Sequence, residues 1–206
     1  MAEAPFHSTK RLRLRAPVPE DAEAIFGGYA SDPATTRYLS WPRHRSIGDT
    51  HAFLAFSKSA WATWPVGPLL IELKETGELL GSTGMDFETS YRASTGFLLM
   101  PKARGFGYAS EALAAVATLA ESLGVRRLYA LCHGSNSSSV RVLERCGFRL
   151  EGTLEKYHVF PNLGDPEPQD VLCYARTYLL VGKPGQSRDL TPAPVSLPAA
   201  QRPRRA

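Results

Sequence analysis

RGFGYASEAL, residues 104–113, places two glycines directly before a run of good helix formers. The N-terminus of a helix leaves its first backbone N–H groups unpaired and carries partial positive charge. Gly105 and Gly107 keep side chains away from those groups, and Arg104 adds a full positive charge, so the stretch can form an anion site suited to phosphate. By itself the pattern is a weak signal, because a glycine before a helix more often makes only a tight connection.

Two nucleotide-binding motifs with similar glycines do not fit this stretch. A P-loop ends in Gly-Lys-Ser/Thr, whereas the chain reads Gly107-Tyr108-Ala109. A Rossmann fingerprint has a third glycine and follows the first strand of a parallel βαβ unit. Here Ser110 takes that third position, and the strands before the loop read as an antiparallel meander. Both nucleotide classes are therefore disfavoured.

The hydrophobic pattern on either side of the loop predicts the neighbouring elements. Apolar residues recur three and four apart after the glycines, which predicts an amphipathic helix over 107–123 that ends at Gly124. Gly96, in the strand before the loop, suggests a bulge or the close approach of another group. Strands are expected over 11–15, 69–73, 79–87, 95–100, 127–131, from 148 onward and over 171–180, with a turn at 75–78, and further helices over 20–30, 48–62 and 137–145.

This order of elements defines the fold class. The chain reads as an α/β protein with a mixed, mostly antiparallel central sheet and helices on both faces. Its 206 residues, 43% of them hydrophobic and 21% charged, suit a single domain. No apolar run is long enough to span a bilayer, and none follows the charges of the N-terminus, so we expect no membrane association and a cytoplasmic location.

The cysteines and histidines argue against a disulfide framework and a metal site. Cys132, Cys146 and Cys173 are odd in number and lack C-x-x-C spacing. His44 and His51 have no partner at a spacing typical of metal ligands. We therefore expect a reduced chain that binds no metal.

Residues 182–206 differ in composition from the rest of the chain. They carry five basic residues, one acidic residue and five prolines, so they account for the whole net charge of +4. This composition is typical of a disordered extension, while Arg202, Arg204 and Arg205 leave open a weak contact with an acidic partner. We divide the chain into an N-terminal extension (1–9), one domain (10–181) and this tail, and we do not expect nucleic-acid binding.

Motifs after the loop make the pattern far more specific. Asn136-Ser137-Ser138-Ser139 is followed by Gly147-Phe148 and then by Glu151-Gly152. Residues 104–109 also match the pattern R/Q-x-x-G-x-G/A, and the strand at 11–15 and Asp170, shortly before Tyr174, fit the same series. The chain thus resembles the GCN5-related N-acetyltransferase (GNAT) family, in particular the branch that acetylates ribosomal-protein N-termini. The resemblance covers about residues 10–181.

The resemblance implies that acetyl-CoA is the co-substrate. In this family the backbone amides of the glycine loop hold the pyrophosphate. The strand before the loop pairs with the pantetheine arm, a main-chain N–H there polarises the thioester carbonyl, and Asn136 bonds to the arm. The cofactor-binding residues implied in this way are Phe97, Leu98, Leu99, Met100, Arg104, Gly105, Phe106, Gly107, Tyr108, Ala109 and Asn136.

The resemblance also implies two catalytic residues. Ser139 would donate a proton to the departing thiolate, the alternative being an ordinary surface or capping serine. The ribosomal-protein branch has an acidic base seven positions beyond the Glu of its E-G pair, and counting from Glu151 reaches His158. A histidine can accept the proton of an ammonium, so His158 is the expected base. Glu155 is the second candidate, and attack by an already neutral amine, with His158 an ordinary strand residue, stays open.

The acceptor side is less well defined. Tyr38 and Trp41 would line the acceptor pocket, given where their loop falls in this family, although aromatic residues in such loops often cover the core. Asp86 is a candidate pocket acid. Cys132 and His133 are adjacent and therefore point to opposite faces of a strand, which argues against covalent catalysis by this pair.

We therefore predict an acetyl-CoA-dependent N-acetyltransferase that moves an acetyl group directly to a primary amine, either a protein N-terminus or a small molecule. The alternative is a catalytically silent CoA-binding module with a regulatory role. A third hypothesis is a ribosome- or nucleic-acid-associated protein anchored by its tail. The sequence leaves the acceptor and the oligomeric state open, a homodimer included.

Overall fold

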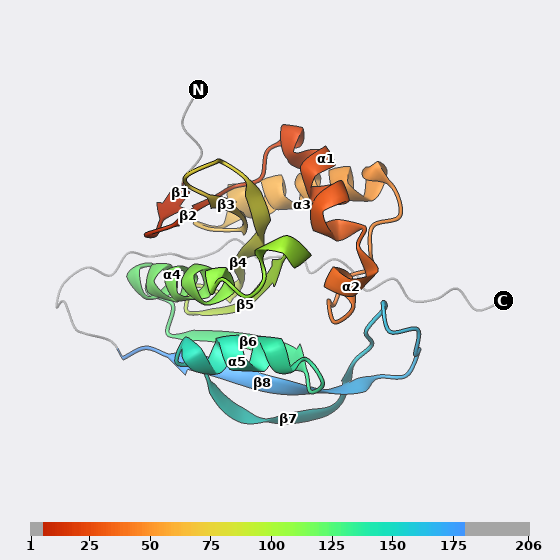
Figure 1. The fold of residues 1–206 in the computed structure, drawn as a ribbon. Helices are drawn as coiled ribbons and strands as arrows, with labels where there is room; N and C mark the ends of the chain where they lie inside the picture. Colours follow the sequence, from red (N-terminus) through yellow and green to blue (C-terminus); the bar gives the residue numbers. More distant parts are fainter. Residues whose placement is uncertain (1–5, 180–206) are drawn as a thin grey trace.

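An eight-stranded sheet forms the centre of the molecule (Figure 1). The computed structural model describes residues 6–179, so the tail predicted at 182–206 lies outside the described residues. The strand order is β1-β2-β3-β4-β5-β6-β8-β7, and among these strands the β5–β6 pair alone is parallel. The strands span Phe6–Ser8 (β1), Leu12–Arg15 (β2), Pro68–Leu73 (β3), Leu79–Thr89 (β4), Arg92–Leu99 (β5), Arg127–His133 (β6), Arg149–His158 (β7) and Gln169–Thr177 (β8).

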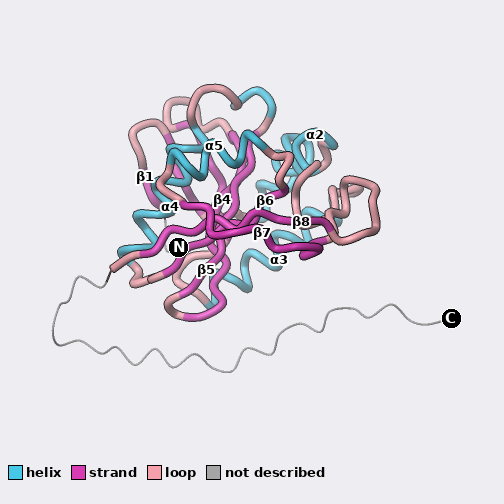
Figure 2. The backbone as a smooth tube through the Cα atoms, turned by 90° about the horizontal axis from the view of Figure 1, so that it is seen from below, coloured by secondary structure: helices cyan, strands magenta, loops and turns pink. Residues whose placement is uncertain are grey.

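Helices cover both faces of this sheet, as the sequence predicts (Figure 2). Helix α4 (Tyr108–Ser122) packs on β2, β4 and β5, with α5 (Ser137–Arg145) beside it. Helix α3 (Ile47–Thr63) contacts β3 and α1 (Ala22–Ile25). Within the described residues, no helix is long and apolar enough to cross a membrane.

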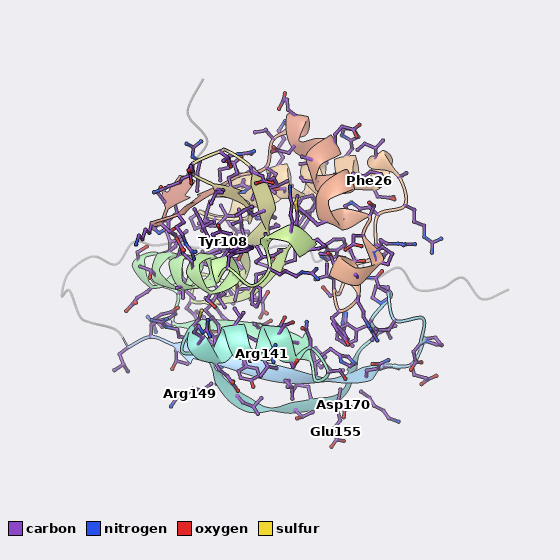
Figure 3. All side chains as sticks on the ribbon, viewed as in Figure 1. Phe26, Tyr108, Arg141, Arg149, Glu155 and Asp170 are labelled. Carbon is purple, nitrogen blue, oxygen red and sulfur yellow. The ribbon has the colours of Figure 1, made fainter. Side chains whose placement is uncertain are left out.

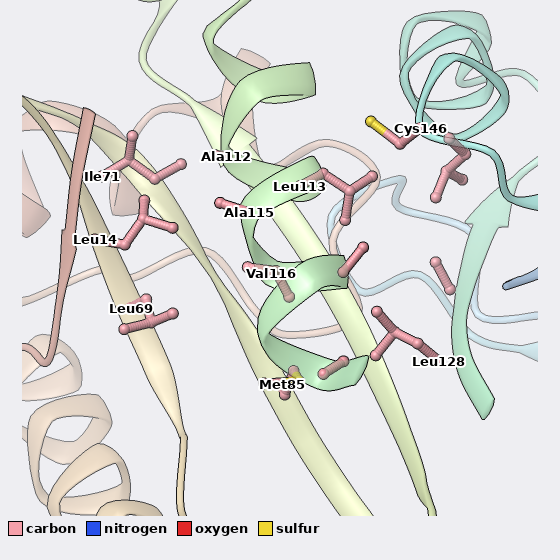
Figure 4. Packing of buried hydrophobic residues seen from close by; sticks show 14 of the residues in the cluster. Leu14, Leu69, Ile71, Met85, Ala112, Leu113, Ala115, Val116, Leu128 and Cys146 are labelled. Atoms are coloured by element: carbon pink, nitrogen blue, oxygen red, sulfur yellow. The ribbon is translucent and has the colours of Figure 1, made fainter. Parts of the chain in front are cut away.

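Alternation along β3 divides the apolar residues between two cores. Leu69 and Ile71 join the larger cluster, where they lie near Val116 of α4 (Figure 4). Leu70 belongs to a second cluster with Ile25 of α1. Because successive side chains of a strand point to opposite faces, one strand fixes helices on both sides of the sheet.

The helix expected over 20–30 is present, but its geometry changes along its length. It begins with a 3-10 turn at Pro19–Asp21, continues as α1 and ends in a π turn at Phe26–Ala30. A Cβ on Gly28 would lie 2.0 Å from Cε of Met100, so the π turn lies directly against the residue after β5. The local pattern carries no sign of this long-range contact.

Besides a 3-10 turn at Pro101–Ala103, two short elements lie outside the predicted set. One is β1, which pairs with β2. The other is α2 (Pro33–Thr36), which begins after Asp32, whose carboxylate accepts hydrogen bonds from the amides of Ala34 and Thr35.

The other predicted helices and strands are confirmed, with shifted ends. The strand expected over 127–131 continues to His133, and the strand expected over 171–180 ends at Thr177. Gly96 lies in regular register opposite Gly84, so it marks no bulge, and the space where its side chain would stand is open.

Candidate active site

Strands β5 and β6 diverge and open a cleft between them. Their parallel pairing is confined to three residue pairs, from Arg92 with Arg127 to Ser94 with Tyr129. Beyond these pairs β5 stays bonded to β4, and β6 stays bonded to β8. The divergence leaves a cavity of about 450 Å³, and along it the β6-facing edge of β5 has no strand partner in the described chain.

Most of the residues predicted to act on the acetyl group or the acceptor line this cavity. Those the structure brings together are Tyr38, Trp41, Asp86, Phe97, Leu98, Asn136, Ser139 and His158. Among the described lining residues Asp86 is the sole carboxylate, and none is a lysine or an arginine. An apolar cleft with a few converging polar groups is typical of a small-molecule site.

The alternation of β6 gives the cavity two sides. Cys132 packs in the larger core cluster, whereas the ring of His133 stacks on Tyr38 with 5.1 Å between centroids. The two residues therefore face opposite ways, as the sequence predicts, and form no nucleophile–base pair. Burial also raises the pKa of the Cys132 thiol to about 11, which keeps it protonated near neutral pH. The cavity thus has a helix side, at α5, and a loop side, at Tyr38 and Trp41.

Ser139 lies on the helix side, in the first turn of α5. Asn136 is the N-cap of this helix, and its side-chain oxygen accepts hydrogen bonds from the Ser139 amide (3.3 Å) and the Ser138 hydroxyl (2.9 Å). Ser137 and Ser138 are exposed, whereas Ser139 lines the cavity. Among the described residues none bonds to the Ser139 hydroxyl or to the side-chain nitrogen Nδ2 of Asn136, so both are free to donate.

His158 lines the cavity from the end of β7. Its ring stands edge-on to Phe160, with 5.0 Å between centroids. Its Nε2 is buried and has no hydrogen-bond partner in the described chain. A buried, unpartnered ring nitrogen is unusual, because such atoms normally find a partner. The position fits a group that exchanges a proton with a ligand.

His133 is held in a different way. Its Nδ1 accepts a hydrogen bond from the Ser135 amide (3.0 Å), and its Nε2 lies 2.7 Å from Oε1 of Gln169. These contacts suit a neutral ring with the proton on Nε2. Both nitrogens are therefore engaged, and His158 is left as the cavity histidine with a free nitrogen.

Asp86 presents an unpaired carboxylate on β4. It lies opposite Ser94 and makes no ion pair with any described residue. Partial burial and then the nearby carboxylate of Glu88 raise the pKa of Asp86. Glu88 itself forms an ion pair with Arg92 at 2.6 Å. Asp86 would therefore gain from a cation supplied by a ligand.

The glycine loop ends at the start of α4 with a row of free amides. Gly105 and Gly107 have φ of +87° and +79°, in the left-handed region that favours glycine. Gly107 is the N-cap and receives no side-chain cap. In the described part of the chain, no group accepts a hydrogen bond from the backbone amides of residues 105–110. Successive free amides at a helix N-terminus make an anion site, so this loop fits the pyrophosphate of acetyl-CoA.

Three residues predicted to bind the cofactor are engaged with the protein itself. Arg104 donates hydrogen bonds to the Leu99 carbonyl (3.2 Å) and the Thr35 hydroxyl (2.7 Å), which ties the loop to α2. The side chains of Leu99 and Met100 are buried in the two cores. Any contribution of these three residues to the donor site would come from their backbone or from the shape they give the loop.

Glu155, the second candidate base, lies away from the cavity. Figure 3 shows it at the outer edge of the molecule near Asp170, which accepts a hydrogen bond from the Lys156 amide at 2.8 Å. Glu155 is exposed and does not line the cavity. The structure therefore favours His158.

Two residues near the site carried no recognisable sequence signal. Arg11 donates a hydrogen bond to the Phe106 carbonyl in the glycine loop, and Asn162 accepts one from the Arg43 amide beside the Tyr38–Trp41 loop. These pairs are 95 and 119 residues apart in sequence. Contacts over such separations do not appear in a local pattern.

Comparisons with known proteins agree with this geometry. A family model described as an acetyltransferase (GNAT) domain matches residues 11–149. YoaA, an uncharacterized N-acetyltransferase of Bacillus subtilis (strain 168), is 31% identical over 161 residues, which are 74% of this chain and 88% of YoaA. A solved GNAT-family acetyltransferase from Bacillus anthracis is 27% identical, with a TM-score of 0.73 over 84% of this chain and 98% of its own. RimL, a ribosomal L7/L12 alpha-N-protein acetyltransferase, shares the fold with a TM-score of 0.75 at 23% identity, over 85% of this chain and 95% of RimL.

The split sheet and the amide-lined loop fit a transferase that draws its acyl group from a CoA thioester. The chain belongs to the GNAT acetyltransferase family. It is an N-acetyltransferase with acetyl-CoA as the acetyl donor, which favours the enzyme over a silent binding module. The family match ends at residue 149, so the interpretation of His158 rests on its place in the cavity.

Proposed function

We propose that this enzyme transfers the acetyl group directly to a primary amine that enters from the loop side of the cavity. The observation that carries the proposal is that Ser139 and His158 line the same cavity, each with an unengaged polar atom. We assign the side of the cavity formed by α5, with Asn136 and Ser139, to the donor and the side formed by Tyr38 and Trp41 to the acceptor.

The donor site uses mainly backbone groups. The amides of residues 105–110 receive the pyrophosphate, and the open edge of β5 at Phe97 and Leu98 pairs with the pantetheine arm. The free side-chain nitrogen Nδ2 of Asn136 donates to a carbonyl of that arm. Backbone donors are fixed before the ligand arrives, so little reorganisation is needed on binding.

His158 and Ser139 each carry out one proton transfer of the reaction. Nε2 of His158 takes the proton that an ammonium must lose before its nitrogen can attack. A C–N bond then forms at the thioester carbonyl, the attacking nitrogen releases its second proton to solvent, and the C–S bond breaks. The hydroxyl of Ser139 passes a proton to the departing sulfur and regains one from solvent, and a main-chain N–H of β5 stabilises the carbonyl oxygen.

Asp86 defines what the acceptor must carry. Its unpaired carboxylate lies in a cavity whose described lining offers no basic side chain, so it holds the ammonium of the acceptor before transfer. Tyr38 and Trp41 contribute apolar surface to the same cavity. We propose a protein N-terminus or a small-molecule amine as the acceptor, and the ribosomal-protein activity in the name of RimL is the model for the former.

Calorimetric titration with acetyl-CoA tests the donor site. The wild type should bind with about micromolar affinity, a typical value for such co-substrates, and Gly107→Glu should abolish binding because it places bulk and negative charge in the amide row. Gly124→Glu is the matched control, since Gly124 also has positive φ in open space but lies at the other end of α4. Absence of binding by the wild type would overturn the donor site.

An amine panel with acetyl-CoA then tests turnover. The wild type should acetylate at least one primary amine, and His158→Ala should lose rate while it keeps donor affinity. Equal rates for His158→Ala and the wild type across pH 6–9 would remove His158 from the mechanism in favour of a neutral amine that needs no base.

A further inference from the structure

A network of hydrogen bonds joins the turn between β1 and β2 to the first turn of α4. The carboxylate of Glu111 accepts hydrogen bonds from the Thr9 hydroxyl (2.5 Å), the Arg11 amide (2.8 Å) and Nε of Arg11 (2.7 Å). Nη1 of Arg11 then donates to the Phe106 carbonyl at 2.9 Å. The guanidinium also lies over the ring of Tyr108, 4.5 Å from its centroid. One side chain thus contacts the glycine loop on both sides of Gly107.

We propose that Arg11 and Glu111 are positioning residues for the acetyl donor: they hold the amides of residues 105–110 in the arrangement that receives the pyrophosphate. The proposal rests on the donor site described above and adds to it two side chains that do not touch the donor. Arg11 acts on the loop through Phe106 and Tyr108, and Glu111 acts by fixing Arg11.

The loop needs such a support because its own sequence does not fix it. Gly105 and Gly107 both take positive φ, and glycine loses more conformational freedom than any other residue when it becomes ordered. Arg104, the charged residue inside the loop, is turned toward Thr35. A loop that is held before the ligand arrives avoids an entropy cost on binding.

The negative charge of Glu111 makes it possible to tell a positioning role from a direct electrostatic effect on donor binding. A carboxylate in the first turn of α4 lies close to the proposed phosphate site and repels an anion there. Burial alone would raise the pKa of Glu111, but the hydrogen bonds from Thr9 and Arg11 lower it below its usual value, so the group is ionised at neutral pH. If charge alone mattered, removal of this carboxylate would strengthen donor binding. If positioning matters, its removal weakens binding.

Calorimetry on Glu111→Gln and Arg11→Gln therefore gives a decisive comparison. Each variant should bind acetyl-CoA about tenfold more weakly, since charge-assisted hydrogen bonds are lost from the support of the loop. Binding of S-acetylpantetheine, which lacks the pyrophosphate, should not change. Arg13→Gln is the matched control, because Arg13 is an arginine two residues further along the chain, is 53% exposed and lies 4.0 Å from its partner, Glu72.

Arg11→Lys separates the geometry of the guanidinium from its charge. A single ammonium cannot reach the Glu111 carboxylate and the Phe106 carbonyl in the way that Nε and Nη1 do, so the lysine variant should stay weakened. The melting temperature of each variant, measured without ligand, shows whether it is folded. Should one glutamine variant fail to fold, the other and Arg11→Lys carry the same comparison.

The possible outcomes differ clearly. Weaker acetyl-CoA binding with unchanged S-acetylpantetheine binding supports the proposal. Tighter or unchanged binding by Glu111→Gln, full recovery in Arg11→Lys, or equal losses for both donors would overturn it. Failure of the wild type to bind acetyl-CoA would instead overturn the donor site itself, and the wild-type titration reports that separately.

Discussion

Ser139 and Ser138 are neighbours with opposite surroundings, which makes them a natural pair for a test. Ser139→Ala should lower kcat about tenfold to a hundredfold, at or below the smallest effect usual for a lost proton donor, because a thiolate with a pKa near 8.5 leaves without much help. The KM for acetyl-CoA should stay within about twofold, since alanine preserves the amide that Asn136 caps. Ser138→Ala loses a hydroxyl bonded to Asn136 and should keep its rate. Steady-state kinetics decides the matter, and equal losses in both variants would assign the effect to the helix cap.

The carboxylate of Asp86 is expected to favour binding of a cationic acceptor. Asp86→Asn should raise the KM for a cationic acceptor by roughly tenfold, because the ammonium loses its counter-charge. The KM for acetyl-CoA should not follow, because Asp86 lies on β4, away from the amide row. Kinetics with each substrate varied in turn measures both values, and a parallel rise in the two would contradict the assignment.

The raised pKa of Asp86 also predicts two pH effects. In the wild type, the KM for a cationic acceptor should rise as pH falls through this pKa, which lies above the ordinary value of 3.8, because protonation removes the counter-charge. For stability the sign is reversed: the folded state binds the proton more tightly than the unfolded chain, so the charged carboxylate disfavours folding above that range. Thermal unfolding of Asp86→Asn at pH 7 should therefore occur at or above the wild-type temperature, and a clear drop would mean that Asp86 has a partner in solution.

At the scale of elements, one side chain joins the two loops that border the acceptor side. The amide nitrogen of Asn162, in the β7–β8 loop, donates to the carbonyls of Thr36 (2.8 Å) and Trp41 (2.9 Å), and its oxygen accepts from the Arg43 amide (2.8 Å). These bonds hold the loop that carries Tyr38 and Trp41. The positions of Tyr38 and Trp41 thus depend on Asn162, which belongs to a different loop.

Asn162→Ala should therefore separate the two substrates. We expect a loss of about 1–2 kcal/mol in the free energy of unfolding, because carbonyls and an amide lose their partner. The KM for the acceptor should rise while the KM for acetyl-CoA stays the same. Asn162→Asp keeps an oxygen that accepts the hydrogen bond from the Arg43 amide, but its carboxylate would face the two carbonyls without a donor. It should therefore lose as much stability as Asn162→Ala. Denaturant unfolding and kinetics test this, and an unchanged acceptor KM would show that the loop is held by other contacts.

Elements whose ends are set by neighbouring residues in the sequence could be predicted. Features that depend on contacts with residues far along the chain could not. Helix α5 was predicted with its bounds, because Asn136 caps its start and Gly147, with φ of +78°, ends it. The helix over 20–30 was also predicted, but its π turn at Phe26–Ala30 was not, and that turn packs against Met100, far along the chain. Arg104 shows the same limit within the site: its charge is visible in the sequence, whereas its hydrogen bond to Thr35 is not.

At the scale of the whole molecule, the cavity follows from strand order. The last strand, β8, inserts between β6 and β7, and β6 parts from β5 after Tyr129. No single segment encodes that divergence, so residue patterns alone could not show that Ser139 and His158 share a cavity. The family resemblance supplied both candidates, and the structure places both in the cavity.

The described residues that form the cores and the cavity fall within one continuous part of the chain. As far as the structure describes them, the residues of both cores and of the cavity lie between Leu12 and Tyr178. A chain that ends at Val181 should therefore unfold within about 0.5 kcal/mol of the full chain, as changes away from packed regions generally do. It should also keep its affinity for acetyl-CoA and its kcat on a small amine.

The removed residues, 182–206, carry the whole net charge of +4, so their effect should depend on salt and on the partner. Measured at low and at physiological salt, turnover of a small amine should be the same for both chains. If the shortened chain loses turnover on a protein acceptor alone, and high salt produces the same loss in the full chain, the tail recruits an acidic partner. Loss of acetyl-CoA binding in the shortened chain would instead contradict the domain boundary at 181, because it would place part of the donor site beyond β8.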